Sequence, residues 1–166
     1  MALPVIRDMV PKSILQRFGI MALVGIIVAR FSPWLNSACR LTDPSGETRD
    51  RQWIGRFGER VATNWLRSRG HLILSRNYRG PRGGEVDIIA RDGKRLLFVE
   101  VKTRTAGQGI RPLDAINRKK QQLIERGANH WISQLGHEKP AWRYDVIEVI
   151  VSEGKKPQIN HVRDAF

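Results

Sequence analysis

Apolar residues recur with two periods along the chain, and each period predicts a set of elements. A spacing of three or four predicts a helix from about residue 49 to residue 69, stopped by Gly70. It also predicts a second helix, capped by Asn117 and ended by Gly136. A spacing of two predicts strands over 71–76, 85–91, 94–102, 142–151 and 159–163. The stretches 77–84 and 104–112 have neither period and are expected to be loops.

Two of these strands carry charged residues among apolar ones. The dipeptide Asp92-Gly93 favours a two-residue hairpin loop, which would pair Glu85 with Glu100. Because side chains alternate between faces, these carboxylates would share one face with Asp87 and Lys102. The opposite face of the second strand is apolar, as in a central strand covered on both sides.

Three carboxylates gathered on such strands repel one another and lose hydration, which is costly unless a cation joins them. A hard divalent cation with oxygen ligands is one solution, and Lys102 would supply a further positive charge. The alternative is a salt-bridged strand end at the margin of the sheet. The spacing alone leaves both interpretations open.

The same residues carry a family resemblance. Asp87, followed by Glu100-Val101-Lys102 on the next strand, resembles the signature of the PD-(D/E)XK nuclease superfamily. Three longer blocks at 77–79, 84–90 and 98–104 resemble, in order, the YraN-like family of uncharacterised bacterial proteins. The resemblance runs from about Gly55 to Phe166. One departure is Val86, which stands where the superfamily's name has proline.

The resemblance implies an α/β fold, a restriction-endonuclease-like α/β/α sandwich with a central mixed sheet flanked by helices. It implies that Asp87 and Glu100 hold Mg²⁺ or Mn²⁺ together with the backbone carbonyl of Val101. Lys102 would orient the attacking water and stabilise charge on the phosphate. Glu85 is a candidate for a neighbouring or second-metal position.

Glu59 on the first predicted helix matches a glutamate that reaches the metal in the resolvase-like branch of the superfamily. The alternative for Glu59 is an exposed carboxylate paired with Arg56 or Arg60.

The charge composition of the chain indicates the kind of partner that it binds. The 166-residue chain has 29 Lys and Arg against 16 Asp and Glu, a formal net charge of +13. Such an excess indicates a polyanion, most simply nucleic acid, although charge that only keeps a protein soluble is the alternative. The candidate nucleic-acid-binding residues lie in the two loops and at the start of the second helix: Arg79, Arg82, Arg104 and Lys119. The lone cysteine, Cys39, excludes an internal disulfide and a cysteine-based zinc site.

The first part of the chain differs from the rest. We expect residues 1–46 to be a poorly ordered extension and residues 47–166 to be the nuclease-like domain. The apolar run 18–29 is shorter than the roughly 20 residues that a membrane-spanning helix needs. We therefore expect a cytoplasmic protein without stable membrane insertion, with a targeting or membrane-associating role for this run as the alternative.

The sequence is compatible with three functional hypotheses. The first is a metal-dependent endonuclease acting on nucleic acid, with DNA favoured over RNA and branched or damaged DNA among the candidate substrates. The second is a catalytically silent nucleic-acid-binding module of the same fold. The third is an interaction protein at the membrane surface, recruited through residues 18–29. The sequence leaves open whether the protein acts as a monomer or a homodimer.

Overall fold

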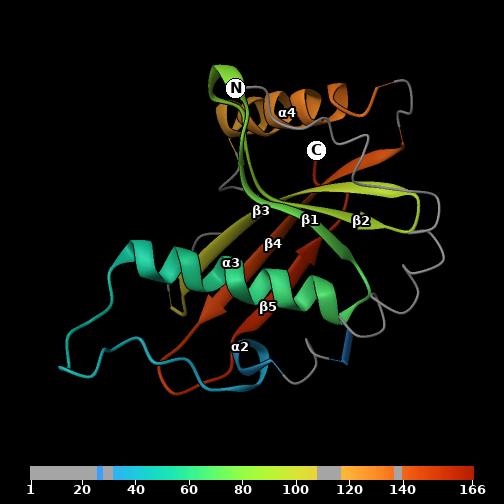
Figure 1. Cartoon of the computed structure of the whole chain (residues 1–166). Helices are drawn as coiled ribbons and strands as arrows, with labels where there is room; N and C mark the ends of the chain where they lie inside the picture. The colour runs from blue at the N-terminus through green and yellow to red at the C-terminus, as the bar shows by residue number, and fades with distance from the viewer. Residues whose placement is uncertain (1–25, 28–31, 108–116, 137–139) are drawn as a thin grey trace, which may run out of the picture.

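The computed structural model describes residues 26–27, 32–107, 117–136 and 140–166 (Figure 1). Five strands form one sheet in the order β1-β2-β3-β4-β5. The strands are β1 (Leu72–Arg79), β2 (Glu85–Asp92), β3 (Arg95–Thr105), β4 (Trp142–Val151) and β5 (Gln158–Val162). Neighbours are antiparallel except β3 and β4, which are parallel, so the sheet is mixed as expected.

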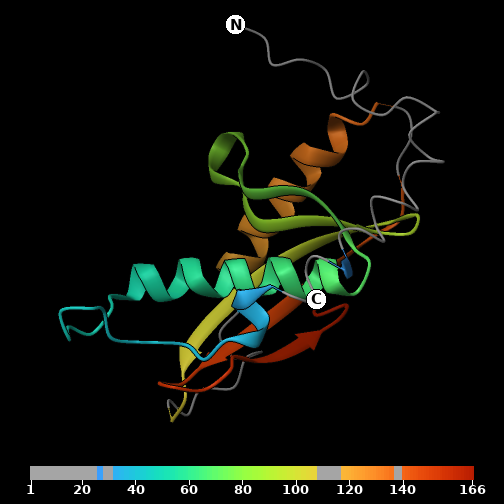
Figure 2. The same cartoon turned by 60° about the horizontal axis from the view of Figure 1, so that its bottom comes forward.

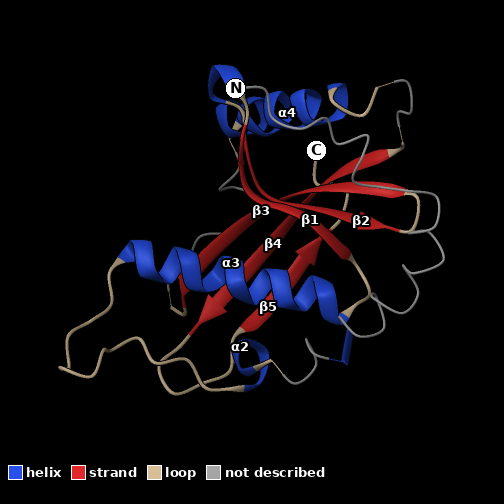
Figure 3. Ribbon diagram, viewed as in Figure 1, coloured by secondary structure: helices blue, strands red, loops and turns tan. Residues whose placement is uncertain are grey.

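Helices α3 (Arg51–Ser68) and α4 (Arg118–Ser133) cover opposite faces of this sheet (Figure 3). Helix α3 runs across the strands, whereas α4 lies by the β1–β2 end (Figure 2). Buried Val61 and Leu66 of α3 pack with Leu97 and Val99 of β3. On the other face, Ile124 of α4 joins a second cluster with Leu96 and Phe98. This layered α/β arrangement is consistent with the expected sandwich.

Both helices begin at the caps that their sequences supply. The Asp50 side chain accepts a hydrogen bond from the backbone N–H of Trp53, and Asn117 accepts one from that of Lys120. Helix α3 ends before Gly70, whose positive φ of 84° turns the chain. Helix α4 ends three residues before Gly136, the expected stop.

The central hairpin forms, but its loop is displaced by one residue. Asp92 pairs with Arg95, which leaves Gly93 and Lys94 as the loop. Gly93 has a φ of +57°, as the first central residue of a type II′ turn requires. Each residue of β2 therefore faces a residue two positions further along β3 than expected, with Ile89 opposite Phe98. A shift of two preserves the faces, so the expected grouping of side chains survives.

Two predicted loops are partly strand. Strand β1 continues to Arg79, and a short 3₁₀ turn, η2 (Pro81–Gly83), replaces the rest of the loop before Glu85. Strand β3 continues to Thr105, so Arg104 is a strand residue. Residues 108–112 of the second predicted loop lie outside the described residues.

The described part of the first 46 residues contacts the sheet and α3. Cys39 is buried, and Leu35 and Leu41 pack against the α3-side cluster. The Cys39 N–H donates to the Lys155 carbonyl at 2.8 Å, and the Gly154 N–H donates to the Cys39 carbonyl at 2.9 Å. The expected domain boundary at residue 47 stays a prediction.

The apolar run 18–29 lies almost wholly outside the described residues. Within the described part of the chain, no helix has both the length and the apolar character needed to cross a membrane.

Candidate metal centre

A fork between β2 and β3 creates the candidate site. The ladder joins these strands from Asp92/Arg95 as far as Ile88/Val99, and beyond that point β2 pairs only with β1. The backbone N–H of Val101 is thereby left without a partner on β2. The Asp87 carboxylate accepts a hydrogen bond from it at 2.8 Å. Asp87 therefore lies at the mouth of the fork, bound to the strand that carries Glu100 and Lys102.

Glu100 is a buried carboxylate, with 2 % of its surface exposed. Its side chain lies on the α4 face, following Leu96 and Phe98 at alternate positions of β3. One carboxylate oxygen, Oε1, is 2.8 Å from the Lys102 ammonium. The other, Oε2, lies 3.2 Å from the Lys120 ammonium but makes no hydrogen bond of good geometry with a described residue.

Lys120 is the residue that the sequence reasoning missed. It projects from the first turn of α4, and its ammonium is 2.5 Å from Glu85 Oε1 as well as near Glu100. The concentration of Arg118, Lys119 and Lys120 against the helix dipole was the available signal. That signal does not say which of the three turns inward, and Lys119 is exposed at the surface.

The electrostatics follow from this crowding. Burial and the negative charge of Glu100 raise the pKa of Asp87 to about 7, against the opposing effects of the Val101 N–H and of Lys120. The hydrogen bond from Lys120 lowers the pKa of Glu85. Burial would lower the pKa of Lys120, but the bond to Glu85 and the charges of Glu100 and Asp87 outweigh it and raise that pKa. The raised pKa of Lys120 keeps its ammonium protonated, whereas the raised pKa of Asp87 means that this carboxyl ionises at a higher pH than an ordinary aspartate.

The donor set fits one hard divalent cation. Asp87 and Glu100 offer carboxylate oxygens, and the buried Oε2 of Glu100 has no hydrogen bond of good geometry from a described residue. Among the described residues, no three His, Cys, Asp or Glu side chains converge on a point. The side chains thus supply two carboxylates, and an ion bound there would need further ligands from the backbone, as expected for the Val101 carbonyl, and from water.

The other expected residues are distributed around this centre. Glu59 lies on α3, which packs on the opposite face of β3, and no described contact joins it to Asp87 or Glu100. Arg79 pairs with Glu85 across the β1–β2 ladder and is exposed. Arg82 lies in the η2 turn, and its side chain is outside the described part.

Arg104 is held by a residue that was not predicted. Its Nε donates to Glu148 Oε1 at 2.5 Å, and Asn160 donates to the other Glu148 oxygen at 2.7 Å. Glu148 is buried and pairs with Lys102 in the parallel β3–β4 register. Polar side chains therefore extend from the candidate centre on β3 to Glu148 on β4 and Asn160 on β5.

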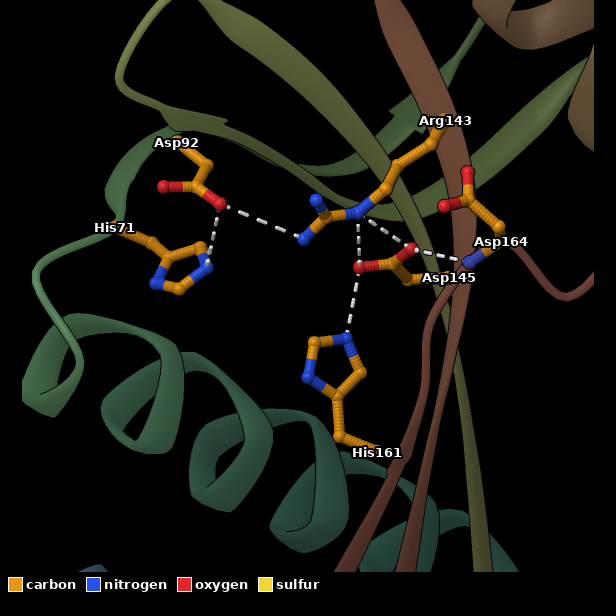
Figure 4. Close-up of polar contacts among 6 residues, drawn as sticks. All are labelled: His71, Asp92, Arg143, Asp145, His161 and Asp164. Atoms are coloured by element: carbon orange, nitrogen blue, oxygen red, sulfur yellow. Dashed lines mark hydrogen bonds and ion pairs between the residues drawn. The ribbon is translucent and has the colours of Figure 1, made fainter.

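A second charged cluster, around Asp145, lies on the α3 side of the sheet (Figure 4). Fully buried Asp145 accepts hydrogen bonds from the Arg143 Nε at 2.9 Å and from the Asp164 N–H at 3.1 Å. His161 Nε2 is 2.8 Å from the same carboxylate. This network ties the C-terminal segment to β4.

Comparisons with known proteins cover the region that holds the candidate centre. The profile of the family described as "Uncharacterised protein family UPF0102" matches residues 58–149. A UPF0102 protein of Alkaliphilus oremlandii is 44% identical over 115 residues, covering 68% of this chain and 97% of the relative. A UPF0102 protein of Geobacter metallireducens is 43% identical over 113 residues, covering 68% and 91%. The resemblance to an uncharacterised bacterial family is thereby confirmed, and the protein belongs to family UPF0102.

Proposed function

We propose that this protein is a metal-dependent phosphodiesterase of the PD-(D/E)XK type that cleaves nucleic acid internally, with DNA as the favoured substrate. The observation that carries the proposal is the fork between β2 and β3. There Asp87 and buried Glu100 meet beside the Lys102 ammonium, and the Glu100 Oε2 atom lacks a hydrogen-bond partner among the described residues. The formal charge of +13 supports a polyanionic substrate.

Each residue has a separate task in this proposal. Asp87 and Glu100 hold the ion, and the Val101 N–H fixes the orientation of the Asp87 carboxylate. Mg²⁺ or Mn²⁺ bound there would polarise the scissile phosphate and lower the pKa of a bound water. Lys102, restrained by Glu100, orients the attacking water and stabilises negative charge developing on the phosphate oxygens. Arg79, Arg82, Arg104 and Lys119 contact neighbouring phosphates and position the strand.

A catalytically silent binding module is the second candidate, and one observation favours it. Both carboxylate oxygens of Glu100 already have a lysine ammonium within 3.2 Å, so the two ammoniums balance two of the three carboxylate charges without any metal. A basic protein of this kind would bind nucleic acid through phosphate contacts alone.

One assay separates the two candidates. Labelled duplex, single-stranded, nicked and four-way DNA, with RNA in parallel, are incubated with Mg²⁺, Mn²⁺ or EDTA. We expect metal-dependent cleavage that falls by at least about 100-fold in Lys102→Ala, because one preorganised charge on the transition state is lost. Binding measured by fluorescence anisotropy should change little. Lys94→Ala, in the exposed hairpin loop, is the control for loss of one lysine.

The negative outcome is equally definite. If wild type and Lys102→Ala bind equally well and neither cuts any substrate with either ion, the binding module is correct. Loss of binding in Lys102→Ala would place the nucleic-acid groove directly over Lys102.

A further inference from the structure

We infer that Lys120 is a built-in cation that fills a second cation position of the centre, so that the protein takes up one divalent ion and not two. The inference rests on the proposed metal centre and adds the number of ions that this centre holds. It concerns the pair Glu85 and Lys120, which the proposed chemistry does not use.

The position of the Lys120 ammonium is the first step. It lies 2.5 Å from Glu85 Oε1 and 3.2 Å from Glu100 Oε2, so it bridges two carboxylates of the fork. Only 19% of the Lys120 side chain is exposed. A solvated surface lysine would not be held between two acidic groups in this way.

The backbone fixes this position. The Lys120 N–H donates to the Asn117 side chain at 3.0 Å, which sets the first turn of α4. Further along, α4 sits directly on the start of β2: a Cβ added to Gly84 would lie 2.5 Å from the Gly127 nitrogen. Because glycines at this crossing bring helix and strand together, Lys120 is held beside Glu85 by the fold itself.

The two carboxylates are not engaged equally. Lys120 makes a hydrogen bond to Glu85 but none of good geometry to Glu100 Oε2. Lys120 is therefore anchored on Glu85, and Glu100 Oε2 remains for an ion shared with Asp87. In centres with two metals the ions are about 3.5–4 Å apart and each needs carboxylate ligands. Here the ammonium already occupies the carboxylate that a second ion would require.

Charge balance points the same way. The carboxylates of Glu85, Asp87 and Glu100 and the ammoniums of Lys102 and Lys120 leave one net negative charge. One divalent ion would bring the net charge to +1, whereas two ions would bring it to +3 in a partly buried site. Removal of the Lys120 charge makes room for a second ion at Glu85.

The test counts Mn²⁺ ions by isothermal calorimetry and equilibrium dialysis on the full chain, without nucleic acid. Wild type should bind one ion, and Lys120→Gln should bind two. Lys120→Arg, which keeps the charge, should return to one. The double variant Lys120→Gln/Glu85→Gln should also bind one, because the second position needs Glu85. Lys119→Gln, the exposed neighbour, is the matched control and should bind one.

Several results would overturn the inference. The inference about Lys120 would be wrong if wild type bound two ions. It would also be wrong if a folded Lys120→Gln variant bound only one ion. Neither result would contradict the proposed metal centre. A second ion that persists without Glu85 would likewise contradict the inference but not the metal centre. If Lys120→Gln fails to fold, Lys120→Met replaces it and should also bind two ions. The number of ions bound by wild type is a test in itself, because two ions there contradict the inference. No ion in wild type would overturn the proposed metal centre and this inference with it.

Discussion

Asp87 and Asp145 show how the pKa values of two aspartates on one sheet come to shift in opposite directions. Burial and the charge of Glu100 raise the pKa of Asp87 to about 7. Burial would also raise the pKa of Asp145, but hydrogen bonds from His161 and Arg143 outweigh it and lower that pKa. A carboxyl with a raised pKa binds its proton more tightly in the folded state, so the free energy of unfolding falls as pH rises toward 7. A carboxyl with a lowered pKa stabilises the fold above its unfolded pKa, and that contribution is lost as pH falls.

Asp87→Asn should therefore stabilise the metal-free protein at pH 8. We expect a gain on the order of 1 kcal/mol in the free energy of unfolding at pH 8 and little change at pH 4. The amide oxygen can still accept the Val101 hydrogen bond. Thermal denaturation in EDTA at both pH values measures the effect. Asp145→Asn is the matched control and should destabilise the fold at pH 8.

A lower melting temperature for Asp87→Asn than for wild type at pH 8 would contradict this account. It would mean that the ionised Asp87 carboxylate stabilises the fork without a metal. Added Mn²⁺ should raise the melting temperature of wild type but not of Asp87→Asn, since the variant lacks one carboxylate ligand.

At the scale of elements, two glycines of α3 have opposite roles. Gly58 faces β3, and a Cβ added there would lie 1.8 Å from the Thr103 hydroxyl oxygen and 2.8 Å from the Thr103 Cβ. Gly55, one turn earlier, has nothing within 4 Å of its added Cβ. Helix α3 thus crosses β3 at Gly58, where no rotation of the Thr103 side chain can make room for a methyl group.

We expect Gly58→Ala to lower the free energy of unfolding by about 1–3 kcal/mol, the usual cost of overpacking. Gly55→Ala should raise it by roughly 0.5–1 kcal/mol, because alanine is the better helix former at a site with space. Urea denaturation of both variants against wild type gives the two values. Equal effects of the two substitutions would show that α3 does not cross β3 as closely as described.

The elements were predictable because both periods in the apolar pattern are strong, whereas features that depend on a single residue step were not. The hairpin loop could be Asp92-Gly93 or Gly93-Lys94, since both contain the glycine. The structure has Gly93-Lys94, which places the glycine first, as a type II′ turn requires. Lys119 and Lys120 differ by about 100° around a helix, and the seating of α4 on Gly84 decides which one reaches the carboxylates. The pairing of Glu148 with Arg104 required the parallel β3–β4 register, which local sequence does not specify.

At the scale of the whole molecule, the segment before residue 47 contributes to the core. Cys39 is 2% exposed, and two backbone hydrogen bonds join it to the β4–β5 turn. The Leu41 N–H also donates to Glu153 Oε2 at 2.6 Å. We expect a chain beginning at Ser32 to be more stable than one beginning at Glu47, by on the order of 2 kcal/mol. Equal urea midpoints for the two chains would show that residues 32–46 are dispensable, as the sequence led us to expect.

The net charge of the molecule makes a final prediction about nucleic-acid binding. Arg79 pairs with Glu85 beside the proposed centre, and Arg82 follows in the η2 turn, so both belong to the proposed phosphate-binding rim. Each phosphate contact releases counterions and contributes about 0.9 to the slope of log affinity against log salt on duplex DNA. Arg79→Ala/Arg82→Ala should therefore weaken binding across all sequences and flatten that slope by about two units.

The control removes the same charge elsewhere. Lys155 and Lys156 are exposed on the turn between β4 and β5, where the Lys155 carbonyl accepts a hydrogen bond from the Cys39 N–H. If net charge alone drives binding, Lys155→Ala/Lys156→Ala should flatten the slope as much as the arginine pair does. If the rim of the fork is the binding surface, the arginine pair should lose about two units and the lysine pair should keep nearly the wild-type slope. Anisotropy titrations of one duplex at several salt concentrations decide between a basic molecule that attracts DNA everywhere and one that holds it over Asp87, Glu100 and Lys102.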